Sequence, residues 1–232
     1  MRFLLIIFLV FNSCFAANKT IKASDIIKRL EKGESVEISD AVIEGALDFS
    51  SAGKLSRVNT AMSEARVKGN VFFFRCVFKG PVTAQKNNAN TRFDGNLVFL
   101  ESEFQKEANF SNATVFGIVN FSKSTFKENA EFNQMAIWAK NSYFSEITAA
   151  KKFSLEGTSF LGSLSIVSAK FLGKFSLQET FVQENLQGSN ANFDGATDFA
   201  MLRVDSRTIF RYAKFKFNPD FSESKFSSPP ER

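Results

Sequence analysis

Apolar side chains along this chain follow a spacing that alternates between five and six residues. The positions are Phe93, Phe99, Phe104, Phe110, Phe116, Phe121, Phe126 and Phe132, and then Phe193, Phe199, Val204, Phe210, Phe215, Phe221 and Phe226. Neither an α-helix nor a flat strand gathers residues with that spacing on one face. A chain that turns a corner every five or six residues does so, and a short fixed period is typical of solenoids. The pattern therefore predicts an all-β coil with phenylalanine inside.

Two residues before a phenylalanine, the side chain is repeatedly small, which marks a second repeated position. Its members are Thr91, Ser102, Ala108, Thr114, Ser124, Ala130, Thr158, Ala169, Ala191, Thr197, Thr208, Ala213 and Ser224. Residues two apart on an extended segment lie on the same face, so we expect both positions to point inward. The residues between and after them are mostly Asn, Ser, Lys, Glu and Gly, which suits a solvent-facing wall.

The segments Ala-Asn-Phe-Ser-Asn at 108–112, Ala-Glu-Phe-Asn-Gln at 130–134 and Ala-Asn-Phe-Asp-Gly at 191–195 resemble the pentapeptide-repeat family. The unit of that family is small, Asp or Asn, Leu or Phe, polar, polar, and the resemblance covers roughly residues 66 to 226. It implies a right-handed, quadrilateral parallel β-helix. With about 22 residues per coil and a rise of about 4.8 Å, 160 residues make about seven coils. Phe99 should then stack on Phe121, and Phe121 on Tyr143.

Three stretches depart from the regular spacing. The polar run from Gln85 to Asn90 predicts that a loop replaces one side of its coil. From Trp138 to about Leu164, and again around Phe171, Phe175 and Phe181, the spacing predicts bulges or a register shift. The inward faces within residues 138–190 therefore stay unassigned.

The two ends of the coil look different from each other. Residues 20–33 predict a short amphipathic helix with Ser24 as its N-cap and Gly33 as its stop, and we expect it to cap the first coil. We divide the chain into a capping helix with a first irregular coil at 17–50, a β-helix at 51–226 and a disordered tail at 227–232. For the far end we expect fraying, a partner, or a homodimer formed with a second copy.

The N-terminus carries nine apolar residues, 3–11, behind Arg2. A helix of that length covers about half of a bilayer core, so residues 1–16 are interpreted as a signal peptide cut between Ala16 and Ala17. This predicts a periplasmic or secreted protein. The alternative is a lipoprotein anchored through Cys14, because a cysteine after an apolar run resembles the lipid-attachment site of bacterial lipoproteins. Only in that case would we expect membrane attachment.

The composition of the chain limits the catalytic and metal-binding chemistry that it can carry out. The chain has no His, which removes imidazole as a base, proton shuttle or metal ligand. Cleavage after Ala16 leaves Cys76 as the only cysteine, and its place two before Phe78 predicts a buried core thiol. The pairs Glu101 with Glu103 and Asp220 with Glu223 could serve as glycosidase carboxylates or a calcium site, but outward solvating residues are the simpler interpretation. We expect no cofactor and no metal.

One charged cluster stands out. Its members are Arg203, Arg207, Arg211, Lys214 and Lys216, against Asp205 alone. These side chains would point outward near the C-terminal end and could bind an envelope protein or an anionic surface. We expect no nucleic acid partner, because the family members that mimic DNA are strongly acidic, whereas this chain is at 28 minus 24, or +4, without residues 1–16.

These observations together predict an exported, non-enzymatic protein that works as a rigid scaffold or as a protein- or envelope-binding surface. The lipoprotein anchored through Cys14 is the first alternative. A remote alternative is a β-helix enzyme that acts on polysaccharide, because long flat walls can host grooves.

Overall fold

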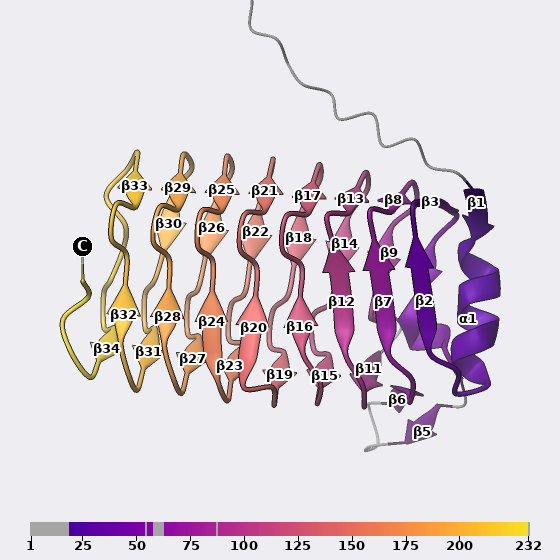
Figure 1. Ribbon diagram of the computed structural model, residues 1–232. Helices are drawn as coiled ribbons and strands as arrows, with labels where there is room; N and C mark the ends of the chain where they lie inside the picture. Colours follow the sequence, from indigo (N-terminus) through magenta and orange to yellow (C-terminus); the bar gives the residue numbers. More distant parts are fainter. Residues whose placement is uncertain (1–18, 54, 58–62, 87, 232) are drawn as a thin grey trace, which may run out of the picture.

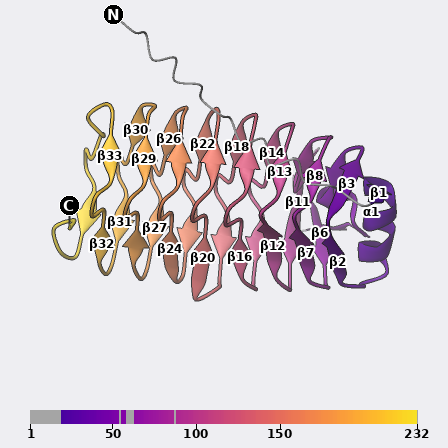
Figure 2. The same cartoon turned by 45° about the horizontal axis from the view of Figure 1, so that its top comes forward.

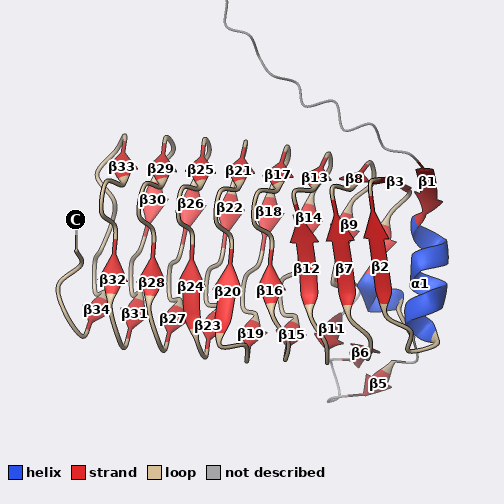
Figure 3. Cartoon of the chain, in the orientation of Figure 1, coloured by secondary structure: helices blue, strands red, loops and turns tan. Residues whose placement is uncertain are grey.

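The structure is a computed structural model that describes residues 19–53, 55–57, 63–86 and 88–231. It is a four-sided parallel β-solenoid of about nine turns with one short helix near the N-terminus (Figures 1 and 3). The chain visits the four sides in turn, and each side is a sheet whose neighbouring strands come from successive coils. The expectation of about seven coils for residues 66–226 is confirmed, and the solenoid is longer because a further coil begins at Val36.

Two sides of the solenoid carry the strands that come first in each coil. Side 1 consists of β2 (Val36–Ser39), β7 (Val71–Phe74), β12 (Leu97–Leu100), β16 (Val119–Asn120), β20 (Asn141–Tyr143), β24 (Ser163–Ser165), β28 (Leu186–Gln187) and β32 (Thr208–Ile209). Side 2 consists of β1 (Lys19–Lys22), β3 (Ala41–Glu44), β8 (Val77–Phe78), β13 (Glu103–Phe104), β17 (Thr125–Phe126), β21 (Thr148–Ala149), β25 (Lys170–Phe171), β29 (Asn192–Phe193) and β33 (Lys214–Phe215). The two ladders run along the whole rod (Figure 2).

The other two sides complete each coil. Side 3 consists of β4 (Leu47–Asp48), β9 (Val82–Thr83), β14 (Ala108–Asn109), β18 (Ala130–Glu131), β22 (Phe153–Ser154), β26 (Phe175–Ser176) and β30 (Thr197–Asp198). Side 4 consists of β5 (Ser56–Arg57), β6 (Ser63–Val67), β11 (Ala89–Phe93), β15 (Thr114–Val115), β19 (Ala136–Ile137), β23 (Ser159–Phe160), β27 (Phe181–Val182), β31 (Arg203–Val204) and β34 (Lys225–Phe226), with β10 (Gln85–Lys86) pairing on β11. A 3₁₀ turn, Phe49–Ser51, follows β4.

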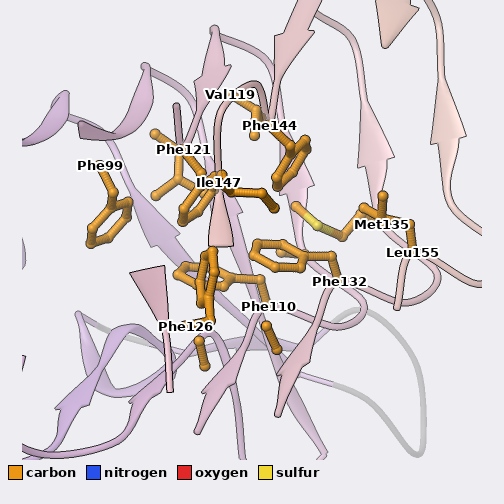
Figure 4. Packing of buried hydrophobic residues seen from close by; sticks show 14 of the residues in the cluster. Phe99, Phe110, Val119, Phe121, Phe126, Phe132, Met135, Phe144, Ile147 and Leu155 are labelled. Carbon is orange, nitrogen blue, oxygen red and sulfur yellow. The ribbon is translucent and has the colours of Figure 1, made fainter. Parts of the chain in front are cut away.

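Phenylalanine rings fill the interior and stack from coil to coil (Figure 4). The ring centroids of Phe99 and Phe121 lie 5.0 Å apart with an interplanar angle of 9°, which confirms the predicted one-coil stacking. Phe110 stacks on Phe132 in the same way, at 5.2 Å and 6°. Parallel pairing holds successive coils one strand spacing apart, so identical residues fall directly above one another. The core is therefore one continuous cluster, in which phenylalanine stacks are interrupted by aliphatic residues such as Leu155 and Ile166.

One predicted contact is wrong. Phe121 stacks on Phe144, at 5.3 Å, and Tyr143 faces outward instead. Val119 pairs with Ser142, 23 residues on, whereas Ser142 pairs with Leu164, 22 residues on. The corner at residues 138–141 thus holds one extra residue. This confirms a register shift after Trp138 and explains why the simple spacing failed there.

The predicted inward positions at 114 and 116 are also wrong. Phe116 is 39% exposed, and Thr114 is half-buried on the outer face, whereas Val115 is buried. Val115 pairs with Phe93 and with Ile137, so this ladder places residue 115 at the coil centre. A branched aliphatic residue takes the inward place and turns its aromatic neighbour to solvent.

The second irregular stretch holds no bulge. Phe175 pairs with Phe153, 22 residues earlier, so the coil length is unchanged. Phe175 is buried at the position two before the coil centre, which is Leu177. Phe181 lies half-buried on the outer face, and Val182 points inward. The short gap between Phe171 and Phe175 arises because Phe175, like Phe153 one coil earlier, takes an inward place that Ala130 and Thr197 fill in other coils.

The polar run near residue 87 does not replace a side, contrary to the expectation. β10 pairs antiparallel with β11, so the extra residues form a hairpin that starts from side 4. Ala84 and Thr91, on either side of the hairpin, are both buried. The coil closes beneath the insertion, and its inward face stays continuous.

The helix α1 (Ala23–Glu31) covers the first coil at one end of the solenoid (Figure 1). Ala23, Ile26, Ile27 and Leu30 are buried against β2 and β4, which confirms the predicted apolar face. The N-cap is Lys22 rather than Ser24, because strand β1 runs straight into the helix. Gly33, with φ of +79°, follows the C-cap as predicted. The helix shields apolar edges that the first coil would otherwise expose.

The predicted signal peptide, the cleavage site at Ala16 and Ala17, and Cys14 lie outside the described residues. Across the described part of the chain, helices are too short and too polar to span a lipid bilayer.

Candidate functional site

The five predicted basic residues all lie exposed in the last coils, but on different sides. Arg203 stands on β31 of side 4, Arg207 and Arg211 flank β32 of side 1, and Lys214 stands on β33 of side 2 with Lys216 just after it. The coil turns a corner between each pair of sides, so the five side chains point in three directions. The structure brings two of them together and keeps the others apart.

Arg207 and Arg211 meet on one carboxylate. The Nη2 atom of Arg207 donates to Oε1 of Glu231 at 2.7 Å, and Nη2 of Arg211 donates to Oε2 at 2.6 Å. The hydrogen bond from Arg207, the largest effect, and the nearby positive charges lower the pKa of Glu231. Glu231 belongs to the next coil, 24 residues after Arg207, so local sequence does not reveal it. The clamp holds both guanidinium groups at fixed positions on the wall.

Arg203 is held by its own strand. Its Nε and Nη2 atoms donate to the two carboxylate oxygens of Asp205 at 2.8 and 3.1 Å. This hydrogen bonding raises the pKa of Arg203 further. The guanidinium also lies 5.2 Å from the centre of the Phe181 ring, one coil earlier. With Lys225, residues 203–231 carry six cations against four acids, Asp205, Asp220, Glu223 and Glu231, which leaves six minus four, or +2, on this end of the rod.

The predicted carboxylate pairs do not converge on a shared site. Glu101 lies 3.9 Å from Lys123, and Glu103 lies 3.6 Å from Lys127, so each pairs with a lysine of the following coil. The hydrogen bond from the Ser222 backbone N–H lowers the pKa of Asp220. In the residues that the structure describes, no three His, Cys, Asp or Glu side chains group to hold a metal ion.

Cys76 is a buried core thiol, as predicted. It is 1% exposed, and its Sγ atom lies 3.5 Å from the carbonyl oxygen of Phe74 and 3.6 Å from that of Ile38. Burial raises the pKa of this thiol. A neutral, enclosed thiol is a poor nucleophile.

A shallow polar groove follows the corner between sides 3 and 4. It has a volume of about 350 Å³ and is lined mainly by Asn112, Gln134, Glu156, Gln178 and Glu179. Several of these corner residues have φ near +57°, for example Gln134 at +55° and Glu179 at +56°. The groove offers amide and carboxylate hydrogen-bonding groups to solvent, without a nucleophile or an aromatic platform.

The corner between sides 4 and 1 carries an exposed apolar group that the sequence did not predict. Phe116 is 39% exposed, Ile118 46% and Trp138 56%. The rings of Phe116 and Trp138 stack with centroids 5.8 Å apart. The five/six spacing assigned Phe116 to the core, and only the neighbouring Val115 signalled otherwise.

A third feature is an apolar cavity of about 600 Å³ in the last coil. Phe210, Phe215 and Phe221 line it from the coil interior, and Tyr212, which is 80% exposed, lies at its rim. Phe215 stacks on Phe193, and Phe221 stacks on Phe199, so these rings continue the stacks of the preceding coil.

Residues 89–135 match the family model described as pentapeptide repeats (9 copies). The chain carries pentapeptide repeats. The same four-sided coil continues on both sides of the matched segment, as the strand ladders show. Pentapeptide-repeat proteins are generally non-enzymatic structural repeat proteins, and this solenoid fits a scaffold-like role of that kind. No curated protein and no solved structure matches the chain.

Proposed function

We propose that this pentapeptide-repeat protein is exported and works as a rigid, non-enzymatic scaffold that binds an acidic envelope protein through its basic end. The observation that carries the proposal is the cluster of Arg203, Arg207, Arg211, Lys214 and Lys216, which makes this end of the rod net positive. A rigid wall that holds charges at fixed positions loses little conformational entropy on binding.

Export is supported by the apolar run at residues 3–11 behind Arg2. The test is mass spectrometry of the protein's N-terminus after expression in a bacterial host. An N-terminus at Ala17 is expected, and a diacylglyceryl group on Cys14 would replace simple export by a lipid anchor. Retention of residues 1–16 in the cytoplasm would contradict both.

The binding test is a crosslinking pulldown from the cell envelope with the full chain. It compares the wild type with a variant in which Arg203, Arg207 and Arg211 are each replaced by glutamate. Long-range attraction to an acidic partner should turn into repulsion, so the captured partner should be lost. A partner that the variant captures equally well would refute the role of the basic end.

A matched control reverses the same number of charges elsewhere. Lys32, Lys106 and Lys170 are exposed on other parts of the rod, and Lys170 stands on side 2. Their replacement by glutamate changes the net charge equally, but should leave capture intact. If both variants lose the partner, overall charge and not the basic end decides binding.

The apolar cavity of the last coil supports a second arrangement, a homodimer through this end. A second copy placed there would cover the half-exposed rings of Phe215 and Phe221 and extend the aromatic stacks. Light scattering coupled to gel filtration should then give twice the chain mass, and Phe221→Ser should return the monomer. A monomeric wild type would rule the homodimer out.

A further inference from the structure

The exposed apolar group between sides 4 and 1 consists of Phe116, Ile118 and Trp138, here named the aromatic corner. Its side chains are 39%, 46% and 56% exposed. Phe116 and Ile118 flank the turn that leads from β15 to β16, and Trp138 follows β19 one coil later, at the lower edge of the rod in Figure 1. Three large apolar residues therefore project from one edge within two coils.

The backbone at this edge dictates that exposure. Val115 and Ile137 occupy the inward places, so the next residue of each coil must point outward. Between Phe116 and Ile118, a Cβ atom on Gly117 would lie 2.5 Å from the carbonyl carbon and oxygen of Gly95. The corner backbones pack too closely to leave room for side chains there, so the apolar groups stand outside the wall.

The aromatic corner is held in place before any ligand arrives. The rings of Phe116 and Trp138 are nearly parallel, with an interplanar angle of 11° and centroids 5.8 Å apart. The Arg92 guanidinium caps the row, 4.4 Å from the centre of the Phe116 ring. Stacking of this kind limits the side-chain entropy lost on binding.

Positive charge surrounds the aromatic corner. Arg66 and Lys68 lie two coils earlier, Arg92 one coil earlier, and Lys140 follows Trp138 in the same corner. The acid among them is Asp94, which accepts hydrogen bonds from both Arg66 and Arg92. Two coils after Trp138 lies a second acid, Glu184, which accepts a hydrogen bond from Ser163. Four cations against two acids leave four minus two, or +2, on this edge.

We propose that the aromatic corner docks the protein on a bilayer surface that contains anionic phospholipid. Trp and Phe prefer the boundary between acyl chains and head groups, and Lys and Arg beside them bind anionic head groups. A second copy is the less suitable occupant, because its own corner would bring the same excess of positive charge. The inference rests on the proposed export to the envelope, but it uses a different surface from the basic end.

Trp138 provides the measurement, because it is the only tryptophan of the chain. The full-length protein is titrated with vesicles of phosphatidylglycerol and phosphatidylethanolamine, and separately with vesicles of phosphatidylcholine. We expect the anionic vesicles to shift Trp138 emission to shorter wavelength and brominated acyl chains to quench it. The readout is specific to the corner, because the apolar run at residues 3–11 contains no tryptophan and its insertion alone leaves the indole of Trp138 in water.

Three variants separate the contributions. Phe116→Ser with Ile118→Ser keeps the reporter but removes two anchors, and should weaken vesicle partitioning by about tenfold or more. Lys68→Glu with Lys140→Glu should also weaken it by about tenfold or more, at low salt only. Leu172→Ser is the matched control: Leu172 is 48% exposed on side 2, away from the corner, and its loss should change nothing.

Each other outcome overturns the proposal. Trp138 emission that stays unchanged with anionic vesicles, even when the protein sediments with them, would mean that residues 3–11 or the basic end binds instead. Emission that shifts with protein concentration and without vesicles would assign the corner to a second copy. The envelope pulldown tests only the basic end, and Trp138 emission tests only the aromatic corner. A negative result in one experiment therefore leaves the other proposal standing.

Discussion

Phe110 and Phe116 stand six residues apart in the same repeating pattern, yet replacing each by alanine should have very different consequences. Phe110 is 0% exposed, stacks on Phe132 at 5.2 Å and meets Phe121 edge-on at 5.3 Å. Phe116 is 39% exposed and stacks on Trp138 with ring centroids 5.8 Å apart. The pair therefore tests the structure where the spacing alone assigns both residues to the core.

The magnitude follows from the area and from what fills the space left behind. A buried phenylalanine removes about 200 Å² from water, worth about 5 kcal/mol at about 25 cal/mol per Å². Phe110→Ala leaves a cavity inside a close-packed column, so we expect a loss of about 4 kcal/mol in the free energy of unfolding. Phe116→Ala opens its space to solvent, without a cavity term, and should cost about 1 to 2 kcal/mol.

The assay is equilibrium unfolding in urea, followed by far-ultraviolet circular dichroism, for the wild type and the two variants. The denaturant slope must be the same in all three, so that the midpoints report stability alone. Unfolding in two separate steps would require the comparison to be made by hydrogen exchange at single residues, because solenoids can unfold in parts. Equal losses for the two variants would refute the outward placement of Phe116.

Three further outcomes are expected. Gly117→Ala should lower the free energy of unfolding by about 1 to 3 kcal/mol in urea, because its Cβ meets the Gly95 carbonyl at 2.5 Å; no loss would mean that the corner can open. Partial burial raises the pKa of Asp94, but hydrogen bonds from two arginines outweigh it and the pKa is lowered from 3.8. Its stabilisation is present above the ordinary pKa and is lost as the pH falls through the lowered one, so the deficit of Asp94→Asn should shrink in acid below about pH 4; a constant deficit would contradict this. Arg207→Glu with Arg211→Glu should move the melting temperature by no more than about 4 °C, because exposed ion pairs contribute little; unfolding by calorimetry would make both arginines structural.

Much of the core was predictable because it repeats. The ladder from Phe99 through Phe121 depends only on a coil of constant length, which the five/six spacing encodes. The prediction failed at Tyr143, because one extra residue in the corner at 138–141 brings Phe144 instead of Tyr143 onto Phe121. It failed at Phe116 because two adjacent apolar residues, Val115 and Phe116, compete for one inward place, and the ladder with Phe93 and Ile137 decides between them.

Of the two candidate surfaces, the sequence revealed the basic residues but not the aromatic corner. The basic residues 203–216 are visible in the sequence, because they are close together along it. Their actual surroundings are not, since Glu231 reaches Arg207 and Arg211 from the following coil. The aromatic corner was missed, because Phe116 and Trp138 lie 22 residues apart in the sequence. Their contact on the surface arises from the stacking of two coils, which the residues around either one do not reveal.

The sequence by itself determined that this chain is a coil, how long each turn is, and that phenylalanine fills it. Those properties follow from side-chain periodicity, which is local and repeated. The tertiary structure decided which of two neighbouring apolar residues points inward, where a coil holds an extra residue, and which charges from different coils meet. These depend on contacts between residues about one coil apart, where closeness in space comes from parallel stacking and leaves no mark on the neighbouring sequence.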